Sequence, residues 1–194
     1  MALSVTDLLT IKQIPDQKDL SLKTIAFFYE EHLMNRQFKF HIRHRAQEIR
    51  VRFEEGSLCH LLGVHHIVSG QEGRSVRGHA NIINDVITFE SMKKLNAGKF
   101  EEFKQRMLAF PLVLQIIKQP TFFEYDPRTN IAKMNWEASS RFGKVYVQLQ
   151  LRKANPNNPN FYAPVSVRIS DQPPRKTRID VKQVEELPID EDWI

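Results

Sequence analysis

Three of the seven histidines of this 194-residue chain lie within seven residues, at His60, His65 and His66. Two arginines, Arg74 and Arg77, follow in a short segment rich in glycine and serine. Imidazole is the side chain best suited to moving protons near neutral pH, and guanidinium is well suited to holding phosphate. Because a metal-free ribonuclease needs both chemistries side by side, this segment is a candidate active site.

Two interpretations of His60 stay open at this stage. It follows Cys59 in an apolar helical context, where a histidine is as often buried and bonded to backbone as it is functional. His65 and His66 point to different faces of any regular structure, so at most one of them joins His60. We take His60, His66, Arg74 and Arg77 as the candidate catalytic residues, with His60 and His66 as the proton-transfer pair.

Zinc is the rival interpretation of the same stretch, because Cys59 and the three histidines are zinc-ligand types. Neither Cys-x-x-Cys nor His-x-x-x-His spacing is present, so we expect no metal site and no cofactor. A lone cysteine in an apolar helix is more typical of a small core residue than of a nucleophile.

The segment Gly70–Gly78 carries both arginines and lacks the Gly-Lys-Ser/Thr ending of a phosphate-binding P-loop. Its glycines predict a flexible loop able to close over a ligand. The alternative is an ordinary solvated connection between two elements. We favour the functional interpretation because the loop directly follows the histidines.

Composition and charge restrict the class of protein. Hydrophobic residues make up 41% and charged residues 26% of the chain, and the net charge is +5. Basic residues concentrate at 36–52 and 175–182, which is typical of a polyanionic partner such as nucleic acid and equally of a solvated strand surface that keeps the protein soluble. A single cysteine, no apolar run near the roughly 20 residues that span a bilayer, and no secretory signal predict a cytoplasmic protein without a membrane partner.

Helical periodicity dominates the first part of the chain and alternating patterns the second. Helices are expected at Leu20–Asn35 and at Phe100–Gln119, the latter interrupted by Pro111. Strands are expected at Phe38–Ile42, Ile49–Phe53, Thr121–Tyr125, Ala132–Trp136, Lys144–Leu151, Phe161–Ile169 and Thr177–Val184. The pattern predicts an α+β fold, an antiparallel sheet of about four to six strands with helices packed on one face. We expect an N-terminal segment at 1–19, a single domain at 20–184 and a loose acidic tail at 185–194.

Strand alternation assigns polar and aromatic side chains to the open face of this sheet, where single-stranded nucleic acid can be stacked and neutralised. The face would display Tyr146, Gln148, Gln150, Arg152, Tyr162, Ser166, Arg168, Lys176 and Arg178. The predicted substrate-binding residues among them are Tyr146, Gln148, Tyr162, Ser166, Arg168 and Arg178.

The order of short motifs resembles a known group of proteins. His60-Leu61-Leu62-Gly63 follows a strand, Phe122-Phe123-Glu124-Tyr125 follows the helices, and Tyr162-Ala163-Pro164 lies in a later strand. Over residues 20 to 184 this order is similar to the phage-associated nuclease-like domains of the barnase–EndoU–colicin–RelE superfamily, in the branch with a His-Leu-x-Gly motif. The resemblance implies metal-independent RNA cleavage on a sheet backed by helices, often in phage or mobile-element toxins.

Two functions therefore remain under consideration. The first is a ribonuclease, a phage or mobile-element toxin or effector, with RNA as substrate and a protein inhibitor or antitoxin as a possible partner. The second is a non-catalytic module of the same fold that binds nucleic acid or protein. RNA cleavage in the presence of EDTA that leaves a cyclic phosphate would distinguish them.

Overall fold

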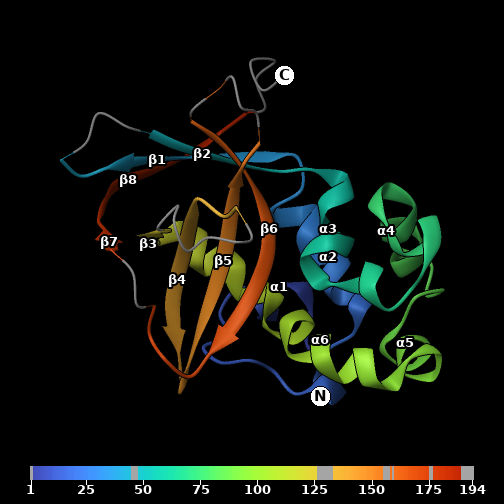
Figure 1. The fold of residues 1–194 in the computed structure, drawn as a ribbon. Helices are drawn as coiled ribbons and strands as arrows, with labels where there is room; N and C mark the ends of the chain where they lie inside the picture. The colour runs from blue at the N-terminus through green and yellow to red at the C-terminus, as the bar shows by residue number, and fades with distance from the viewer. Residues whose placement is uncertain are drawn as a thin grey trace.

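The structure, a computed structural model, describes residues 2–44, 48–125, 133–154, 158, 160–174 and 177–188. Helices precede most of the sheet, as the sequence predicts (Figure 1). The helices are α1 (Val5–Leu8), α2 (Leu22–His32), α3 (Leu58–Leu62), α4 (Ser75–Ile83), α5 (Phe89–Leu95), α6 (Ala97–Ala109) and α7 (Val113–Lys118). The short 3-10 turns are η1 (Gln17–Asp19), η2 (Glu55–Ser57), η3 (Val64–His66), η4 (Gly70–Gly73) and η5 (Phe110–Leu112).

One mixed sheet contains all the described strands, in the order β7-β3-β4-β5-β6-β2-β1-β8. The strands are β1 (Arg36–Ile42), β2 (Glu48–Phe53), β3 (Thr121–Glu124), β4 (Trp136–Phe142), β5 (Val145–Lys153), β6 (Phe161–Ser170), β7 (Thr177–Ile179) and β8 (Val181–Leu187). Neighbours are antiparallel except β2 and β6, which pair in parallel over two residues.

The two edge strands are consecutive in the chain, separated only by Asp180. β7 pairs with β3, while β8 pairs with β1 at the opposite end of the strand order. The Asp180 carbonyl accepts a hydrogen bond from the Arg43 backbone N–H at 2.8 Å. The sheet therefore curls until it is nearly a barrel.

The expected antiparallel sheet of four to six strands is thus wrong in strand number, pairing and shape. The sheet has eight strands and is mixed, and closing it nearly into a barrel removes most of its exposed edge. β8 runs to Leu187, so Glu185, Glu186 and Leu187 lie in the sheet rather than in a loose tail. Residues 189–194 lie outside the described residues.

The apolar side of the curled sheet forms the core together with the helices. Phe40 of β1 and Phe122 of β3 meet there edge to face, with ring centroids 5.0 Å apart. α7 contacts β4 and β5, and Val147, Leu149 and Leu151 on one face of β5 are fully buried, as the alternation predicts, while Val145 on the same face is half-buried. Leu8 from the N-terminal segment is also buried in this core.

Proline positions mark two departures from regular structure. Pro111 lies in η5, the 3-10 turn that separates α6 from α7, which confirms the predicted interruption. In β6 the pairing with β5 shifts by one residue, from Gln150 opposite Ser166 to Leu151 opposite Pro164. An extra residue in one strand turns the following side chains to the other face.

The β6 bulge corrects one expectation about the open face. Tyr162 was predicted to be exposed beside Ser166 and Arg168. Its side chain lies on the core side instead, 4% exposed, with its ring edge to face with Trp136. No helix in the described part of the chain is long and apolar enough to cross a membrane.

Candidate active site

The three clustered histidines form a stack with one aromatic residue of α6. Ring centroids are 4.6 Å apart between His60 and His65, 3.9 Å between His65 and His66, and 4.6 Å between His66 and Phe103. We call these four residues the histidine stack. His65 Nδ1 lies 3.4 Å from the Cys59 carbonyl oxygen, which fixes the middle ring, while the His60 and His66 residues are exposed.

Gly63 makes the stack possible because it ends α3 in the left-handed conformation, with φ of 78°. A Cβ atom at this position would overlap the Phe103 ring and lie 3.1 Å from the Arg106 guanidinium. Glycine alone tolerates both the φ value and the close approach. The glycine of His60-Leu61-Leu62-Gly63 therefore has a direct structural role in bringing Phe103 against the histidines.

Arg106 of α6 links the stack to the sheet. Its Nε donates to the Val167 carbonyl of β6 at 2.8 Å, and a terminal nitrogen donates to the Ser166 hydroxyl. Its guanidinium carbon also lies 5.2 Å from the centroid of the Phe103 ring. A phosphate placed beside the histidines would meet this anchored guanidinium, which is planar and carries several donors.

The surroundings favour neutral histidines at pH 7. Burial lowers the pKa of His60, and the positive charges of Arg106 and Arg152 lower it further. Burial lowers the pKa of His65 to about 4, against the opposing effect of its hydrogen bond with the Cys59 carbonyl. Burial, followed by the charge of Arg106, also lowers the pKa of His66. A neutral imidazole next to a guanidinium can accept a proton beside a bound phosphate.

The family model for phage-Barnase-EndoU-ColicinE5/D-RelE like nuclease 4 matches residues 21–186. The chain belongs to this nuclease-like family. The resemblance drawn from the sequence motifs is therefore confirmed. No curated protein and no solved structure matches the chain at a significant level.

The two predicted catalytic arginines, Arg74 and Arg77, differ in their position relative to the histidine stack. Residues 70–78 form η4 and the first turns of α4 rather than a flexible loop. Burial is the main cause of the lowered pKa of His65 and of His66, and the charge of Arg74 makes a smaller contribution in the same direction. Arg77 lies on α4 in an exposed ion pair with Glu72.

The glycines that suggested a loop serve close packing. A Cβ atom on Gly78 would lie 2.7 Å from the Cys59 sulfur, and one on Gly73 would overlap the Val68 carbonyl. Cys59 itself is buried, and burial raises the pKa of its thiol to about 12. It is a core residue and not an activated nucleophile.

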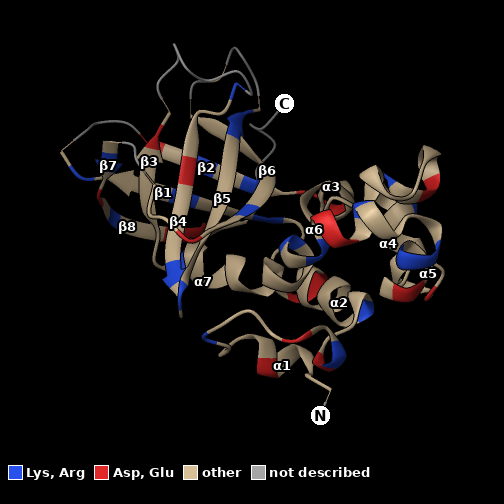
Figure 2. Ribbon diagram, turned by 60° about the horizontal axis from the view of Figure 1, so that its bottom comes forward, with Lys and Arg blue, Asp and Glu red and all other residues tan. Residues whose placement is uncertain are grey.

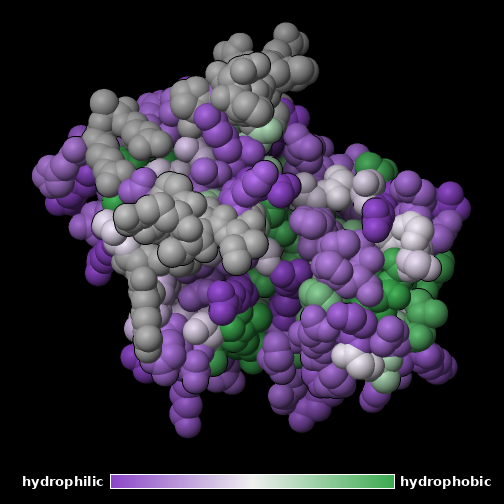
Figure 3. Space-filling view, in the orientation of Figure 1, coloured by the Kyte–Doolittle hydropathy of each residue, from purple (hydrophilic) through white to green (hydrophobic). Residues whose placement is uncertain are grey.

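A polar cluster lies on the outer face of the sheet, away from the core, next to the position where Arg106 meets Ser166. The Gln150 amide donates to the Tyr125 hydroxyl at 2.6 Å, and this hydroxyl donates to Glu137 at 2.8 Å. Gln150 is directly opposite Ser166 in the β5–β6 register. Basic residues of β2, β5 and β6 lie along the strands in Figure 2, and hydrophilic side chains dominate the surface in Figure 3.

The predicted substrate-binding residues on this face differ in accessibility. Arg168 and Arg178 are exposed, Ser166 is partly buried and bonded to Arg106, and Gln148 is only 4% exposed. Tyr146 lies near the end of β5 away from Arg152, and Arg178 lies on the edge strand β7, three strands away from β5. Sequence reasoning missed Arg106 as a site residue, because nothing in its local pattern reveals that α6 packs against β6.

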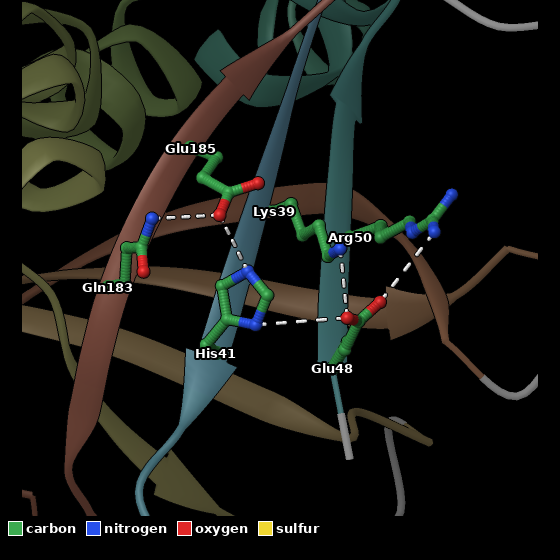
Figure 4. Close-up of polar contacts among 6 residues, drawn as sticks. All are labelled: Lys39, His41, Glu48, Arg50, Gln183 and Glu185. Atoms are coloured by element: carbon green, nitrogen blue, oxygen red, sulfur yellow. Dashed lines mark hydrogen bonds and ion pairs between the residues drawn. The ribbon is translucent and has the colours of Figure 1, made fainter. Parts of the chain in front are cut away.

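A second histidine site lies on β1, on the face of the strand opposite its core side chains (Figure 4). His41 Nε2 is 3.0 Å from a Glu185 carboxylate oxygen of β8, and Nδ1 is 3.7 Å from Glu48 of β2. Lys39 contacts the same Glu48 oxygen at 2.9 Å, and this hydrogen bond lowers the Glu48 pKa. Both ring nitrogens are directed at carboxylates, so His41 connects three strands.

A metal centre has no obvious set of ligands in the described part of the chain. No group of three or more histidine, cysteine, aspartate or glutamate side chains within those ranges could hold an ion. The chemistry that these residues offer is proton transfer by imidazole and charge stabilisation by guanidinium.

Proposed function

We propose that the protein is an endoribonuclease that cleaves cytoplasmic RNA by general acid–base chemistry without a metal ion. The observation that carries this proposal is the exposed His60 at one end of the histidine stack, with the anchored guanidinium of Arg106 against Phe103 at the other end. Burial, followed by the charges of Arg106 and Arg152, lowers the pKa of His60, which favours its action as a base. Membership in a nuclease-like family supports nuclease activity.

His60 is the general base in this mechanism. It removes the proton from the RNA 2′-hydroxyl, whose oxygen attacks the adjacent phosphorus and forms a 2′,3′-cyclic phosphate. The bond from phosphorus to the 5′-oxygen breaks, and this oxygen takes up its proton from the minor fraction of His66 that is protonated at pH 7, since the pKa of His66 is lowered. Arg106 stabilises the negative charge that grows on the phosphate, which is the role that the sequence suggested for Arg74 and Arg77.

The test is incubation of the purified protein with RNA in EDTA, followed by analysis of the 3′ ends. We expect 2′,3′-cyclic ends from the wild type and a rate about 10²- to 10⁴-fold lower from His60→Ala, with RNA affinity retained. His44→Asn is the matched control. His44 is exposed beyond the end of β1 with a φ of 61°, a value that asparagine tolerates.

Three results would contradict this function. Cleavage only with added divalent cations would contradict the metal-free mechanism, and wild-type cleavage by His60→Ala would contradict the assigned base. Binding of RNA or protein by the wild type without any cleavage would favour the non-catalytic module.

We also propose that the nuclease acts as a toxin or effector of a phage or mobile element and has a protein inhibitor. The family description, which names phage, is what supports this role. Induced expression of the wild type should stop cell growth, and expression of His60→Ala should not. Equal growth of the two strains at equal protein levels would contradict the toxin role.

A further inference from the structure

A cavity of about 420 Å³ opens at the far end of the outer sheet face from the histidine stack. Side chains of β3, β4, β5 and β7 line it together with the segment that follows β6. The residues that matter for its chemistry are Phe123, Ser139, Arg141, Tyr146, Pro174 and Arg178. The strand register places Tyr146 opposite Arg141 and Phe123 opposite Arg178, and Ser139 lies on β4 between these two pairs.

The walls of this distal cavity suit a flat, partly polar ligand that carries a negative charge. Phe123, Tyr146 and Pro174 supply apolar and aromatic surface. Arg141 and Arg178 are exposed and supply positive charge. Arg178 contacts Asp180 at 3.1 Å, but both side chains are more than half exposed, so this pair is weak and can yield to a ligand.

Ser139 provides an independent sign of a ligand. It lines the cavity, is only 3% exposed, and its hydroxyl has no hydrogen-bond partner within the described part of the chain. A buried hydroxyl without a partner is costly, and native proteins rarely keep one. A ligand that reaches it with a polar edge would satisfy it.

We propose that the distal cavity binds one nucleotide of a single-stranded RNA, with the base between the aromatic and proline side chains and its phosphate at the two arginines. The proposal rests on the function proposed above. Tyr146 and Arg152 are six residues apart on β5, which corresponds to about 20 Å along the strand. Arg168 is exposed between them, in register with Gln148. The protein therefore selects RNA long enough to reach from the histidine stack to the cavity.

Equilibrium binding tests this site separately from cleavage. The probes are fluorescent 2′-O-methyl oligouridines of 3 and 12 nucleotides, which lack the attacking hydroxyl and cannot be cleaved. Tyr146→Ala should weaken binding of the 12-mer about tenfold or more and that of the 3-mer less, because a 3-mer can still bind beside the histidine stack whereas the 12-mer loses one of the two sites that it spans. Arg141→Ala/Arg178→Ala should do the same, whereas Lys182→Ala, which removes an exposed charge from β8 outside the cavity, should not.

Ser139→Ala provides a variant that leaves the fold intact, since it removes only one unpartnered hydroxyl. It should change the relative affinities of 12-mers made of uridine and of adenosine, whereas an abasic 12-mer should bind the wild type at least tenfold more weakly than oligouridine. Equal affinity of the wild type for abasic and base-bearing 12-mers would overturn the proposal. So would equal loss of 3-mer and 12-mer binding in Tyr146→Ala. If the length dependence holds and RNA is never cleaved, the ribonuclease function fails and the nucleotide site stands.

Discussion

Two histidine sites of this protein place the same side chain in opposite electrostatic surroundings. His41 lies between the carboxylates of Glu48 and Glu185, and both of its ring nitrogens are directed at them. His60 lies at the end of the histidine stack, where the nearby charges are the guanidinium groups of Arg106 and Arg152.

This difference separates a structural histidine from a candidate base. Both ring nitrogens of His41 contact carboxylates on neighbouring strands, so neither nitrogen is available to a substrate. The stack uses little of its hydrogen-bonding capacity, since among the described residues only His65 of the three histidines contacts a backbone group, the Cys59 carbonyl at 3.4 Å. Stacking orders the rings, burial is the main cause of their lowered pKa values, and the surrounding arginines attract an anion to them.

Removing the guanidinium next to the stack should give the largest effect. Arg106→Ala should lower kcat/KM for RNA by about 10²- to 10³-fold, the usual cost of losing one donor that stabilises growing charge. Arg106→Lys should recover part of the rate because it keeps the charge and loses the planar fork. Initial rates with a fluorescent RNA, together with melting curves, make the measurement. A wild-type rate in Arg106→Ala would remove this residue from the mechanism.

The glycine that admits Phe103 to the stack comes next. Gly63→Ala should lower the free energy of unfolding by about 1–3 kcal/mol, since it adds a left-handed strain and a clash with Phe103. Chemical denaturation measures this change. Gly143→Ala is the control because its φ is also positive, at 60°, but a Cβ there has open space. Equal losses in the two variants would mean that backbone strain alone matters and that the contact with Phe103 does not.

Lowering the pH should destabilise the folded protein, because His65 in the histidine stack binds a proton less readily than it does in the unfolded chain. The unfolded His65 takes up a proton near its ordinary pKa of 6.5, whereas the folded one does so only near 4. The contribution of His65 to the free energy of unfolding is therefore highest above pH 6.5, where His65 is neutral in both states. It should fall by about 1–2 kcal/mol, after allowance for solvent screening, as the pH decreases toward 4. Comparison of the pH dependence of unfolding for the wild type and His65→Gln isolates this effect. Identical slopes between pH 7 and 4 would contradict it.

Changes at the second histidine site should have the smallest effect. His41→Gln should cost about 1 kcal/mol of stability or less, since the partners are partly exposed and such ion pairs contribute little. The rate of RNA cleavage should stay within about twofold of the wild-type rate, because His41 has no role in the proposed mechanism. A loss of cleavage comparable with that of His60→Ala would reverse the roles of the two sites.

Local patterns were sufficient to predict most of the elements and part of the site, although the strand expected at Ala132–Trp136 overlaps β4 at Trp136 only. The Pro111 interruption and the buried face of β5 follow from short-range spacing. The grouping of the histidines was only partly predicted, because both His65 and His66 join His60 in the stack where at most one was expected. The turn of Tyr162 into the core depends on a single extra residue in β6, which strict alternation cannot show. Pro164 was the available signal, because a proline within a strand favours a bulge or an edge.

The remaining errors concern contacts between distant parts of the chain. The pairing of β8 with β1 and the packing of Arg106 on β6 join residues far apart in sequence, and neither leaves a local pattern. The same holds for the glycines at 73 and 78, which resemble a flexible loop until the neighbours of their missing side chains are known.

The pairing of β1 with β8 also has a consequence for how the chain folds. Gln37 is opposite Leu187, so closing the sheet joins residues 150 positions apart. Ladders of such long range form slowly, because the entropy of loop closure must be overcome before any contact compensates for it. Until that step, β1 presents an unpaired edge to other chains. We therefore expect refolding yields to fall with protein concentration, and variants that delay docking of β8 to aggregate before they lose native stability.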